Sequence, residues 1–355
     1  MEIFGKKLIG WYLQNQRKLP WRETGDPYKI WLSEVILQQT RINQGLDYYV
    51  KFVESFPDIH SLACAPEKEI YKLWQGLGYY NRAQNLIHAA RTIANEYNGR
   101  FPGTKEELMK IKGIGPYTAA AISSIAFGKP DPVVDGNVFR VLSRVFGIKS
   151  PIDTAGGKKE FVSLAGRLME GHPPGDFNQA LMEFGAVWCK PKNPDCVHCI
   201  FYDECVARKQ NTVSELPVKK PKARVKDRFF YYVVAQTQNE RIIMKKRGPD
   251  DIWKNLYDFP LFVTGQRTQA LKALNTLTGK LAPAGLVYSI KHISHEYIHL
   301  LTHQRIHAVF IRIIVENFPE NRLENNVLLI NQNDIENYPV PRLVEQYLQD
   351  QKLIK

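Results

Sequence analysis

Four of the five cysteines of this 355-residue chain lie within seventeen residues, in the stretch CKPKNPDCVHCIFYDEC. They have the spacing C-x6-C-x2-C-x5-C and are Cys189, Cys196, Cys199 and Cys205. Four thiolates placed so compactly hold either one zinc ion or an iron–sulfur cluster, and the spacing alone leaves both open. His198 lies inside the motif, but four cysteines complete a tetrahedral set, so we expect it to be exposed. We expect Cys64, the fifth cysteine, to be a buried core thiol.

A disulfide knot is the third way to use four cysteines, and the rest of the chain disfavours it. The first residues, MEIFGKKLIGWYLQNQRKLPWR, interrupt their apolar positions with charge too often for a secretory signal. No apolar run approaches the ~20 residues of a membrane span. We therefore expect a cytoplasmic protein with reduced thiols and no membrane partner.

The charge of the chain predicts a polyanionic partner. Lys and Arg number 48 against 36 Asp and Glu, which gives a net charge of +12 and a pI near 9.3. A basic chain of this size most often binds nucleic acid. Six of the ten residues in KKPKARVKDR, 219–228, are basic, and the stretch has no apolar periodicity. We interpret it as part of a basic linker, 216–227, between two domains.

The chain before this linker has the pattern of helices. In DPYKIWLSEVILQQTRINQ, Asp26 is an N-cap and Pro27 stands at the first helical position. In TKEELMKIKGIGPYTAAAISSIAFG, Thr104 and Glu107 predict a capping box on a short helix, and Pro116 opens a second helix. The sequence therefore predicts a helix-hairpin-helix motif.

The turn KGIGP between these two helices is suited to a phosphate. Gly113 and Gly115 let the backbone approach a phosphate closely, and the following helix N-terminus offers unpaired N–H groups. Such a hairpin contacts the nucleic-acid backbone and not the bases.

The chain after the linker changes to a pattern of strands. RFFYYVVAQ and RIIMKKR predict two paired strands, HAVFIRIIVE predicts another, and PVPRLVEQYLQD predicts a closing helix. We expect a mixed α+β domain over residues 228–355.

Together these motifs resemble a known family. The hairpin at 108–122, the aspartate in VVDGNVFRVLSRV and the cysteine spacing resemble the endonuclease III superfamily of DNA glycosylases. Within it, LPWR, SEVILQQTRI, WQGLGYYNRAQNL, GIGPYTAAAI and NQALMEFGA resemble the MutY adenine glycosylases, in order through nearly all of residues 1–215.

The resemblance implies a fold, a cofactor and a partner. The fold is an α-helical helix-hairpin-helix glycosylase domain, 1–215, followed by an α+β Nudix-like domain, 228–355. The cofactor is a structural 4Fe–4S cluster in the loop 189–205, held by the four cysteines named above. The partner is double-stranded DNA that carries adenine opposite 8-oxoguanine or guanine. We expect the protein to act as a monomer.

The chemistry of N-glycosidic cleavage calls for two carboxylates in different environments, one to protonate the leaving base and one to face the developing cation. Glu34 has Ile30 and Trp31 one turn before it and Leu37 one turn after, an apolar setting that raises a pKa and suits a general acid. Asp135 precedes a helix, whose N-terminus favours the ionised form. The resemblance implies that these two are the catalytic acid and the catalytic aspartate.

Further site residues follow from the resemblance. Tyr117 stands where lyase relatives carry the lysine of a Schiff base, which predicts a monofunctional enzyme. Asn137 is expected to position the aspartate or a water, or to be a turn residue only. The adenine-binding residues are expected to be Trp21, Arg22 and Glu183. Gln39 and Tyr79 are expected to wedge into the base stack.

The C-terminal domain carries a second set of expectations. GPDDIWKNLYDFP resembles the Nudix-related domain, but GQRTQALKALNTLTG contains no glutamate to hold magnesium, so we expect recognition without pyrophosphate hydrolysis. HISHEYIHL resembles the Phe-Ser-His loop that recognises 8-oxoguanine, with Ser294 and His295 present and Ile293 in place of the phenylalanine. Its histidines alternatively belong to a histidine-rich strand.

Two other functions remain alternatives. A thymine-mismatch glycosylase would not need the C-terminal domain. A non-catalytic, cluster-bearing DNA-binding or redox protein would not need both Glu34 and Asp135.

Overall fold

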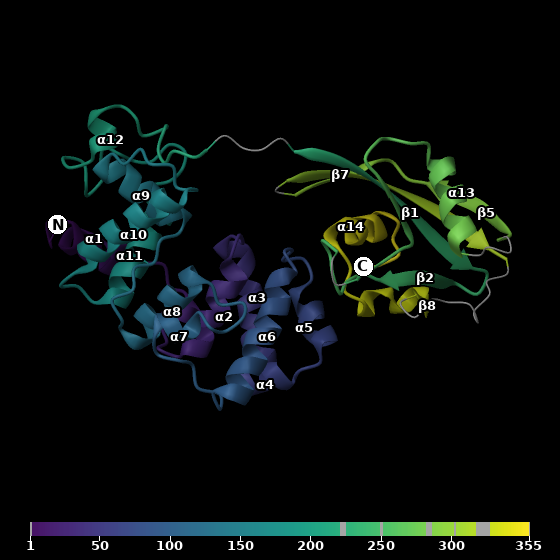
Figure 1. The fold of residues 1–355 in the computed structure, drawn as a ribbon, viewed down its shortest axis with the longest axis horizontal. Coiled ribbons are helices and arrows are strands. Elements are labelled where there is room, and N and C mark those ends of the chain that lie inside the picture. Colours follow the sequence, from purple (N-terminus) through teal and green to yellow (C-terminus); the bar gives the residue numbers. More distant parts are fainter. Residues whose placement is uncertain are drawn as a thin grey trace. The chain divides into compact units, whose positions relative to one another are not determined.

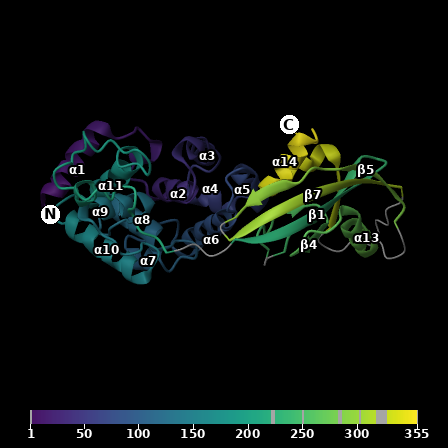
Figure 2. The same ribbon diagram turned by 90° about the horizontal axis from the view of Figure 1, so that it is seen from above.

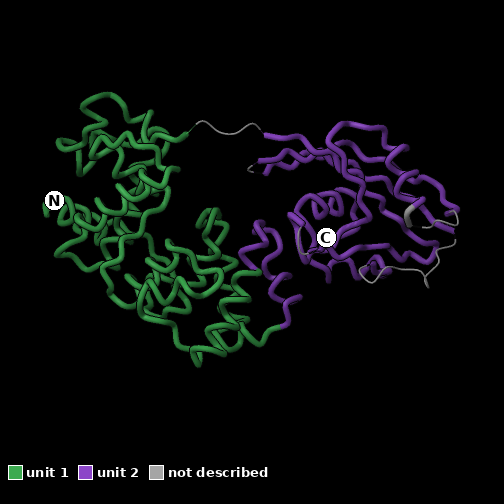
Figure 3. The backbone as a smooth tube through the Cα atoms, viewed as in Figure 1, with its two compact units in different colours: residues 1–65, 84–221 green, residues 66–83, 222–355 purple. Residues whose placement is uncertain are grey.

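The computed structural model describes residues 2–220, 225–248, 251–281, 286–301, 303–316 and 327–354. Contacts divide the chain into two compact units, residues 1–65 with 84–221 and residues 66–83 with 222–355 (Figure 3). The sequence predicted a first domain that runs without interruption from 1 to 215. The contacts instead group residues 66–83 of that range with the second unit. Residues 221–224 of the predicted linker and 249–250 of the GPDD stretch lie outside the described residues.

The first unit is built from helices (Figure 1). Their bounds are α1 (Glu2–Asn15), η1 (Pro20–Arg22), α2 (Pro27–Leu37), α3 (Ile42–Ser55), α4 (Ile59–Cys64), α6 (Asn81–Glu96), α7 (Lys105–Leu108), α8 (Pro116–Phe127), α9 (Gly136–Phe146), α10 (Ala155–Met169), α11 (Pro174–Val187) and α12 (Val206–Lys209). Helix α6 begins in the segment 66–83 and continues into the first unit.

The helix starts follow the caps that the sequence predicts. Asp26 accepts a hydrogen bond from the Tyr28 N–H, with Pro27 at the first position of α2. Thr104 accepts from the Glu107 N–H at 3.4 Å. The Glu107 carboxylate bonds the Thr104 hydroxyl at 2.7 Å, not its backbone N–H, so only half of the expected capping box forms.

The helix-hairpin-helix motif is confirmed as α7, a turn and α8. Gly113 has φ +99°, and a Cβ there would lie 2.7 Å from the Asn85 Cβ and 2.9 Å from its carbonyl oxygen. Gly115 is the N-cap of α8 with φ −87°, and a Cβ there would meet nothing within 4 Å. The first glycine is required by the fold, whereas the second is not.

Helices α1, α9, α10 and α11 share one core. It includes Leu8, Leu142, Phe161, Leu168 and Phe177. Cys189 and Cys199 pack against its edge. Cys64 is exposed, so its predicted burial is wrong. It ends the short helix α4, where Ile59 and Leu62 supply the buried face and leave Cys64 on the other side.

The second unit contains a mixed sheet that is eight-stranded in the described part of the chain. Its strands are β1 (Lys226–Thr237), β2 (Arg241–Lys246), β3 (Tyr257–Asp258), β4 (Leu261–Thr264), β5 (Tyr288–Ile293), β6 (Tyr297–Leu300), β7 (Gln304–Val315) and β8 (Val327–Asn331). Its path runs β3-β2-β1-β7-β5, and β4, β6 and β8 pair with β1, β7 and β2. Strands β1 and β7 are parallel over their full length, and the other pairs are antiparallel.

Two helices cover opposite faces of this sheet (Figure 2). Leu274 and Leu277 of α13 (Ala270–Leu281) pack against Val233 on one face. Tyr347 of α14 (Arg342–Asp350) stacks on Phe310 of β7 with ring centroids 4.0 Å apart, on the other face. The turn η3 (Gln332–Asn337) precedes α14. The predicted strands and closing helix are confirmed.

The segment 66–83 contains α5 (Glu67–Trp74) and joins the second unit by hydrogen bonds to its C-terminal part. The Tyr80 hydroxyl donates to the Val340 carbonyl at 3.2 Å, and the Gln75 amide donates to Glu345 at 2.8 Å. These bonds explain why contacts place the segment there. Among the described residues, no helix combines the length and apolar composition that a membrane span requires.

Candidate active site

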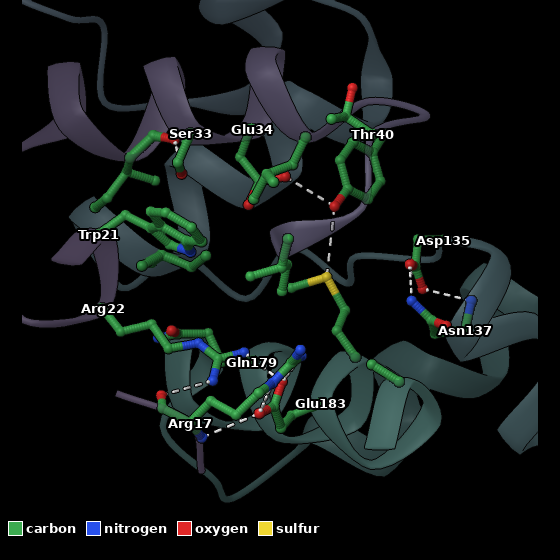
Figure 4. A pocket seen from close by; sticks show the side chains of 17 residues that line it. Arg17, Trp21, Arg22, Ser33, Glu34, Thr40, Asp135, Asn137, Gln179 and Glu183 are labelled. Carbon is green, nitrogen blue, oxygen red and sulfur yellow. Dashed lines mark hydrogen bonds and ion pairs between the residues drawn. The ribbon is translucent and has the colours of Figure 1, made fainter. Parts of the chain in front are cut away.

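A pocket of about 180 Å³ lies in the first unit, between α2, α8, α11 and the turn before α9. This volume is smaller than the ~300–1,000 Å³ of pockets for drug-sized ligands, so the pocket suits a small ring system. Glu34 and the Arg22–Glu183 pair lie on opposite walls (Figure 4). Trp21, Tyr117, Asp135 and Asn137 also line it, so the pocket brings together all the residues predicted for catalysis and adenine binding: Trp21, Arg22, Glu34, Tyr117, Asp135, Asn137 and Glu183.

Glu34 has the perturbed acidity that its sequence context predicts. Burial raises the pKa of its carboxyl to about 7, and the nearby charge of Asp135 adds to the shift. The Tyr117 hydroxyl donates a hydrogen bond to Glu34 Oε2 at 2.8 Å and acts in the opposite direction, towards a lower pKa. A carboxyl with this pKa holds a proton that it can transfer near neutral pH.

Asp135 is the N-cap of α9, as predicted. Its Oδ1 accepts from the N–H groups of Asn137 and Val138 at 2.9 and 2.8 Å. These bonds lower its pKa, but burial is the larger effect, so the pKa is raised from its usual value. The N-terminus of α9 thus favours the ionised form of Asp135, as predicted, but desolvation, which the sequence argument did not include, outweighs it.

Asn137 holds the aspartate from a second direction. Its side-chain N–H donates to Asp135 Oδ2 at 2.7 Å, so both carboxylate oxygens are fixed. The Asn137 Oδ1 in turn accepts from Arg140 at 2.8 Å. Arg140 also donates to the carbonyls of Gly185 and Cys189, at 2.6 and 2.7 Å. Arg140 therefore connects the N-terminus of α9, which holds Asp135, to the cysteine loop that begins at Cys189.

Glu183 is held by two arginines on the opposite wall. Its Oε1 accepts from the Arg17 backbone N–H at 3.1 Å and from Arg17 Nε at 2.7 Å. Its Oε2 accepts from Arg17 at 2.6 Å and from Arg22 at 2.7 Å. Despite burial, these bonds lower the pKa of Glu183 to about 2. A carboxylate has about four lone-pair sites, and all of them have donors here.

Sequence reasoning missed two arginines of this region. Arg17 precedes the LPWR motif, and nothing in the local pattern marks it. Arg140 had a signal: it lies on α9 between the apolar residues Phe139 and Val141, and it is only 8% exposed. A buried arginine in such a position needs acceptors, which the loops around it supply.

A second hollow of about 710 Å³ lies beside the hairpin and shares Glu34, Tyr117 and Asp135 with the pocket. Gly113 and Gly115 line it, as does Gln39, an exposed residue with φ +58°. Its position between the hairpin and the acid makes it the candidate surface for a DNA strand. Tyr79 lies in the segment 66–83 of the second unit, 54% exposed and with φ +48°.

The four clustered cysteines are free thiols, each partly exposed. Burial raises the pKa of Cys196, Cys199 and Cys205, and the charge of Cys189 adds to each rise. Arg144 donates to Cys189 Sγ at 3.5 Å, and its carbonyl accepts from Cys205. Within the described residues, no three His, Cys, Asp or Glu side chains close around a single point. His198 is exposed, as predicted, and bonds Asp195.

The candidate loop for the opposite base lies between β5 and β6 in the second unit. Ser294 is buried: its Oγ accepts from the Phe310 N–H at 2.9 Å and donates to the His295 carbonyl at 2.7 Å. His295 is exposed and its ring stacks on Tyr297 with centroids 4.3 Å apart. Ile293 is 39% exposed at the end of β5.

Comparison with known proteins agrees with these two units. The family described as HhH-GPD superfamily base excision DNA repair protein matches residues 32–162, and the NUDIX domain family matches residues 231–350. A thermostable thymine-DNA glycosylase has a TM-score of 0.54 and 33% identity, covering 59% of this chain and 96% of its own. A trapped endonuclease III–DNA covalent intermediate has a TM-score of 0.51 and 22% identity, covering 58% and 94%, which indicates a shared fold.

Curated relatives extend over both units. An adenine DNA glycosylase of Buchnera aphidicola subsp. Acyrthosiphon pisum is 31% identical and covers 99% of this chain and 98% of its own. One of Buchnera aphidicola subsp. Schizaphis graminum is 37% identical, covering 75% and 77%. The adenine DNA glycosylase of Homo sapiens is 41% identical, covering 58% and 40%.

The helical hairpin fold and the two-carboxylate pocket define a DNA glycosylase of base excision repair. The second unit matches the NUDIX domain family, and the adenine DNA glycosylase that covers 99% of this chain extends over both units. The chain belongs to the adenine DNA glycosylase family, MutY.

Proposed function

We propose that this enzyme is a monofunctional glycosylase that hydrolyses the N-glycosidic bond of adenine mispaired with 8-oxoguanine or guanine in double-stranded DNA. The observation that carries the proposal is Glu34, a carboxyl with a pKa of about 7 that shares one pocket with Asp135. The target adenine leaves the duplex to enter this pocket. We propose that the enzyme is a cytoplasmic, DNA-associated protein that acts as a monomer.

The two carboxyl groups divide the chemistry. Glu34 donates its proton to the leaving adenine, which departs as a neutral base. Asp135, held by Asn137 and the N-terminus of α9, faces the sugar and stabilises the positive charge that develops there. Tyr117 supports Glu34 through its hydroxyl. Because tyrosine has no amine for a Schiff base, the strand is left intact.

Adenine recognition is assigned to Trp21, Arg22 and Glu183. The Trp21 ring is buried at the pocket wall, where it offers an apolar surface to the base. Glu183 accepts from the exocyclic amine and Arg22 donates to a ring nitrogen. All four lone-pair sites of Glu183 are already occupied, so one arginine donor must release the carboxylate when adenine enters.

The cofactor proposed for the cysteine loop is a 4Fe–4S cluster on Cys189, Cys196, Cys199 and Cys205. The four-thiol spacing and the likeness to the endonuclease III superfamily support this cofactor, because a cubane takes one thiolate on each iron. A single zinc would need all four on one centre. The purified protein should be yellow-brown with about four irons per chain; a colourless, fully active protein with one zinc contradicts the cluster.

The base opposite adenine is contacted by two proposed sets of residues. Gln39 and Tyr79 wedge into the base stack beside it. Ser294 and His295 recognise it when it is 8-oxoguanine. The N7 hydrogen of 8-oxoguanine is a donor that guanine lacks, so an acceptor is required. The Ser294 hydroxyl donates a hydrogen bond to the His295 carbonyl and accepts one from the Phe310 N–H, so its oxygen keeps one lone pair for this purpose. The hairpin glycines Gly113 and Gly115 hold the DNA backbone.

One assay tests the proposal. Full-length protein is incubated with defined A:8-oxoguanine, A:G and T:G duplexes, with and without alkali to cleave abasic sites. We expect adenine release from the first two, strand breaks only after alkali, and no covalent complex trapped by borohydride. Release of thymine from T:G would favour the thymine-mismatch alternative, and efficient trapping would contradict the monofunctional assignment. Absence of any base release would favour the non-catalytic alternative.

A further inference from the structure

His307, the fourth residue of β7, contacts a carboxylate through each of its two ring nitrogens. Nδ1 lies 2.9 Å from Glu296 Oε1, and Nε2 lies 3.1 Å from Asp227 Oδ1. The side chain is only 12% exposed, and its ring stacks on Phe229 with centroids 4.8 Å apart. No residue of the catalytic pocket is involved.

This geometry selects the charged form of the imidazole. A neutral imidazole has one N–H, so it can donate to one carboxylate only and turns a lone pair towards the other. The imidazolium has both N–H groups and satisfies both partners. The pKa of His307 is raised from its usual value, because its bonds to Glu296 and Asp227 outweigh burial.

The other charged groups around His307 balance the two carboxylates. Arg267, which follows β4, pairs with Glu296 at 2.7 Å. Arg305, on β7 itself, lies 3.7 Å from Asp227. Glu296 thus has two cationic partners, and it loses one of them when the imidazole becomes neutral.

The two partners of His307 lie in different parts of the unit. Asp227 is the second residue of β1. Glu296 lies in the turn between β5 and β6 that begins with Ser294 and His295. Ser294 fixes one end of this turn, because it exchanges hydrogen bonds with the backbone of Phe310 in both directions at 2.9 Å. Glu296 fixes the other end through His307, so the exposed His295 ring stands between two anchors.

We propose that protonated His307 is a positioning residue that clamps the 294–296 turn and makes discrimination of the opposite base dependent on pH. The inference rests on the proposed function, because it assumes that this turn contacts the base opposite adenine. As the pH rises through the pKa of His307, the clamp loses a donor, the turn loosens, and the preference for A:8-oxoguanine over A:G falls. Below that pKa the preference is at its maximum.

The test is the ratio of single-turnover rates on the two duplexes, measured across pH for the full-length protein. Both duplexes use the same Glu34, so its titration cancels in the ratio. His307→Gln should lower the ratio at neutral pH roughly fivefold, the factor that corresponds to a hydrogen bond of about 1 kcal/mol, and flatten its pH dependence. Glu296→Ala, which removes the partner of Nδ1, should do the same. His303→Gln, at an exposed histidine just before β7, is the matched control and should leave the ratio unchanged.

Asp227→Asn gives the sharpest prediction. An asparagine amide donates to a neutral Nε2, so the neutral imidazole can keep its Nδ1 proton on Glu296. This variant should therefore retain the high ratio at neutral pH and keep it at high pH. NMR titration of the His307 imidazole nitrogens, assigned with His307→Gln, should show a pKa above the ordinary value in wild type and a lower one in Asp227→Asn.

Two outcomes overturn the clamp. They are an unchanged ratio in His307→Gln, whether or not both rates fall together, and a His307 that titrates at or below its ordinary value. A wild type that prefers neither duplex overturns the proposed recognition of 8-oxoguanine instead, and the NMR titration then still reports on the hydrogen bonds of His307.

Discussion

Glu34 and Glu183 face one pocket, yet their pKa values move in opposite directions. Glu34 is surrounded by apolar side chains and has one hydroxyl donor, so desolvation dominates and the pKa rises to about 7. Glu183 has two arginines, and the pKa falls to about 2. The difference comes from the partners, not from burial, and it is the basis on which we propose proton donation for Glu34 and a fixed negative charge for Glu183.

Replacement of Glu34 by glutamine keeps the shape of the side chain and removes the transferable proton. General acid catalysis contributes ~10²–10⁴-fold, so adenine release should fall at least that far while duplex binding survives. Single-turnover rates and a mobility-shift titration measure the two quantities. Unchanged turnover would reject Glu34 as the acid.

The pH profile of adenine release follows from the same pocket. Activity needs Glu34 protonated, so the rate on A:8-oxoguanine should fall as the pH rises through about 7. It also needs Asp135 ionised; because that pKa is raised, the acid limb should lie above the ordinary range of an aspartate.

Tyr117→Phe removes a hydrogen bond that lowers the pKa of Glu34, so the alkaline limb should move to higher pH. A limb that moves the other way contradicts this assignment.

At the scale of elements, the hairpin offers a matched pair of glycines. Gly113→Ala forces a Cβ against the Asn85 backbone at a positive φ, so the free energy of unfolding should fall by more than about 1 kcal/mol. Gly115→Ala meets open space at an ordinary φ, so folding should be unaffected. If the backbone at Gly115 approaches a phosphate, this variant should still bind DNA more weakly. Thermal unfolding and filter binding separate the two effects, and normal DNA binding by Gly115→Ala would remove the phosphate role from that residue.

Much of this level was predictable from sequence, because it depends on local patterns. The N-caps Asp26 and Asp135, the proline that opens α8 and the β-branched and aromatic residues of β1 each act within a few positions. Charges that meet across the fold were not predictable. Arg17 reaches Glu183 across 166 positions, and no short-range pattern encodes that contact. The net rise in the pKa of Asp135 was not predictable for the same reason, since burial is decided by distant parts of the chain.

For the molecule as a whole, the division of labour between the units is testable. Residues 1–215 contain the acid, the aspartate and the adenine pocket, so this fragment should still release adenine. It lacks Ser294 and His295, and the preference for A:8-oxoguanine over A:G should shrink roughly ten- to hundredfold, from hydrogen bonds of ~0.5–1.5 kcal/mol and unpaired groups of ~1–3. Rates and affinities on both duplexes measure it.

Two full-length variants control for side effects of truncation. Ser294→Ala with His295→Ala should reproduce the lost preference and keep the maximal rate closer to wild type. Tyr80→Phe removes the bond to the Val340 carbonyl and tests whether the segment 66–83 contributes to the preference. A double variant that discriminates as well as wild type would show that the 294–296 turn does not recognise the opposite base.

The segment 66–83 is synthesised early and anchored late. Its hydrogen bonds reach Val340 and Glu345, 260 and 270 positions further along the chain. At about 5–20 residues per second, a ribosome completes α5 roughly 13–52 s before its partners emerge. By the end of that interval every residue of the proposed catalytic pocket has been made, but the turn that carries Tyr79 still has no C-terminal anchor. A stop codon at position 342 removes α14 and the residues after it, and so deprives this turn of Glu345 although the whole pocket has been translated.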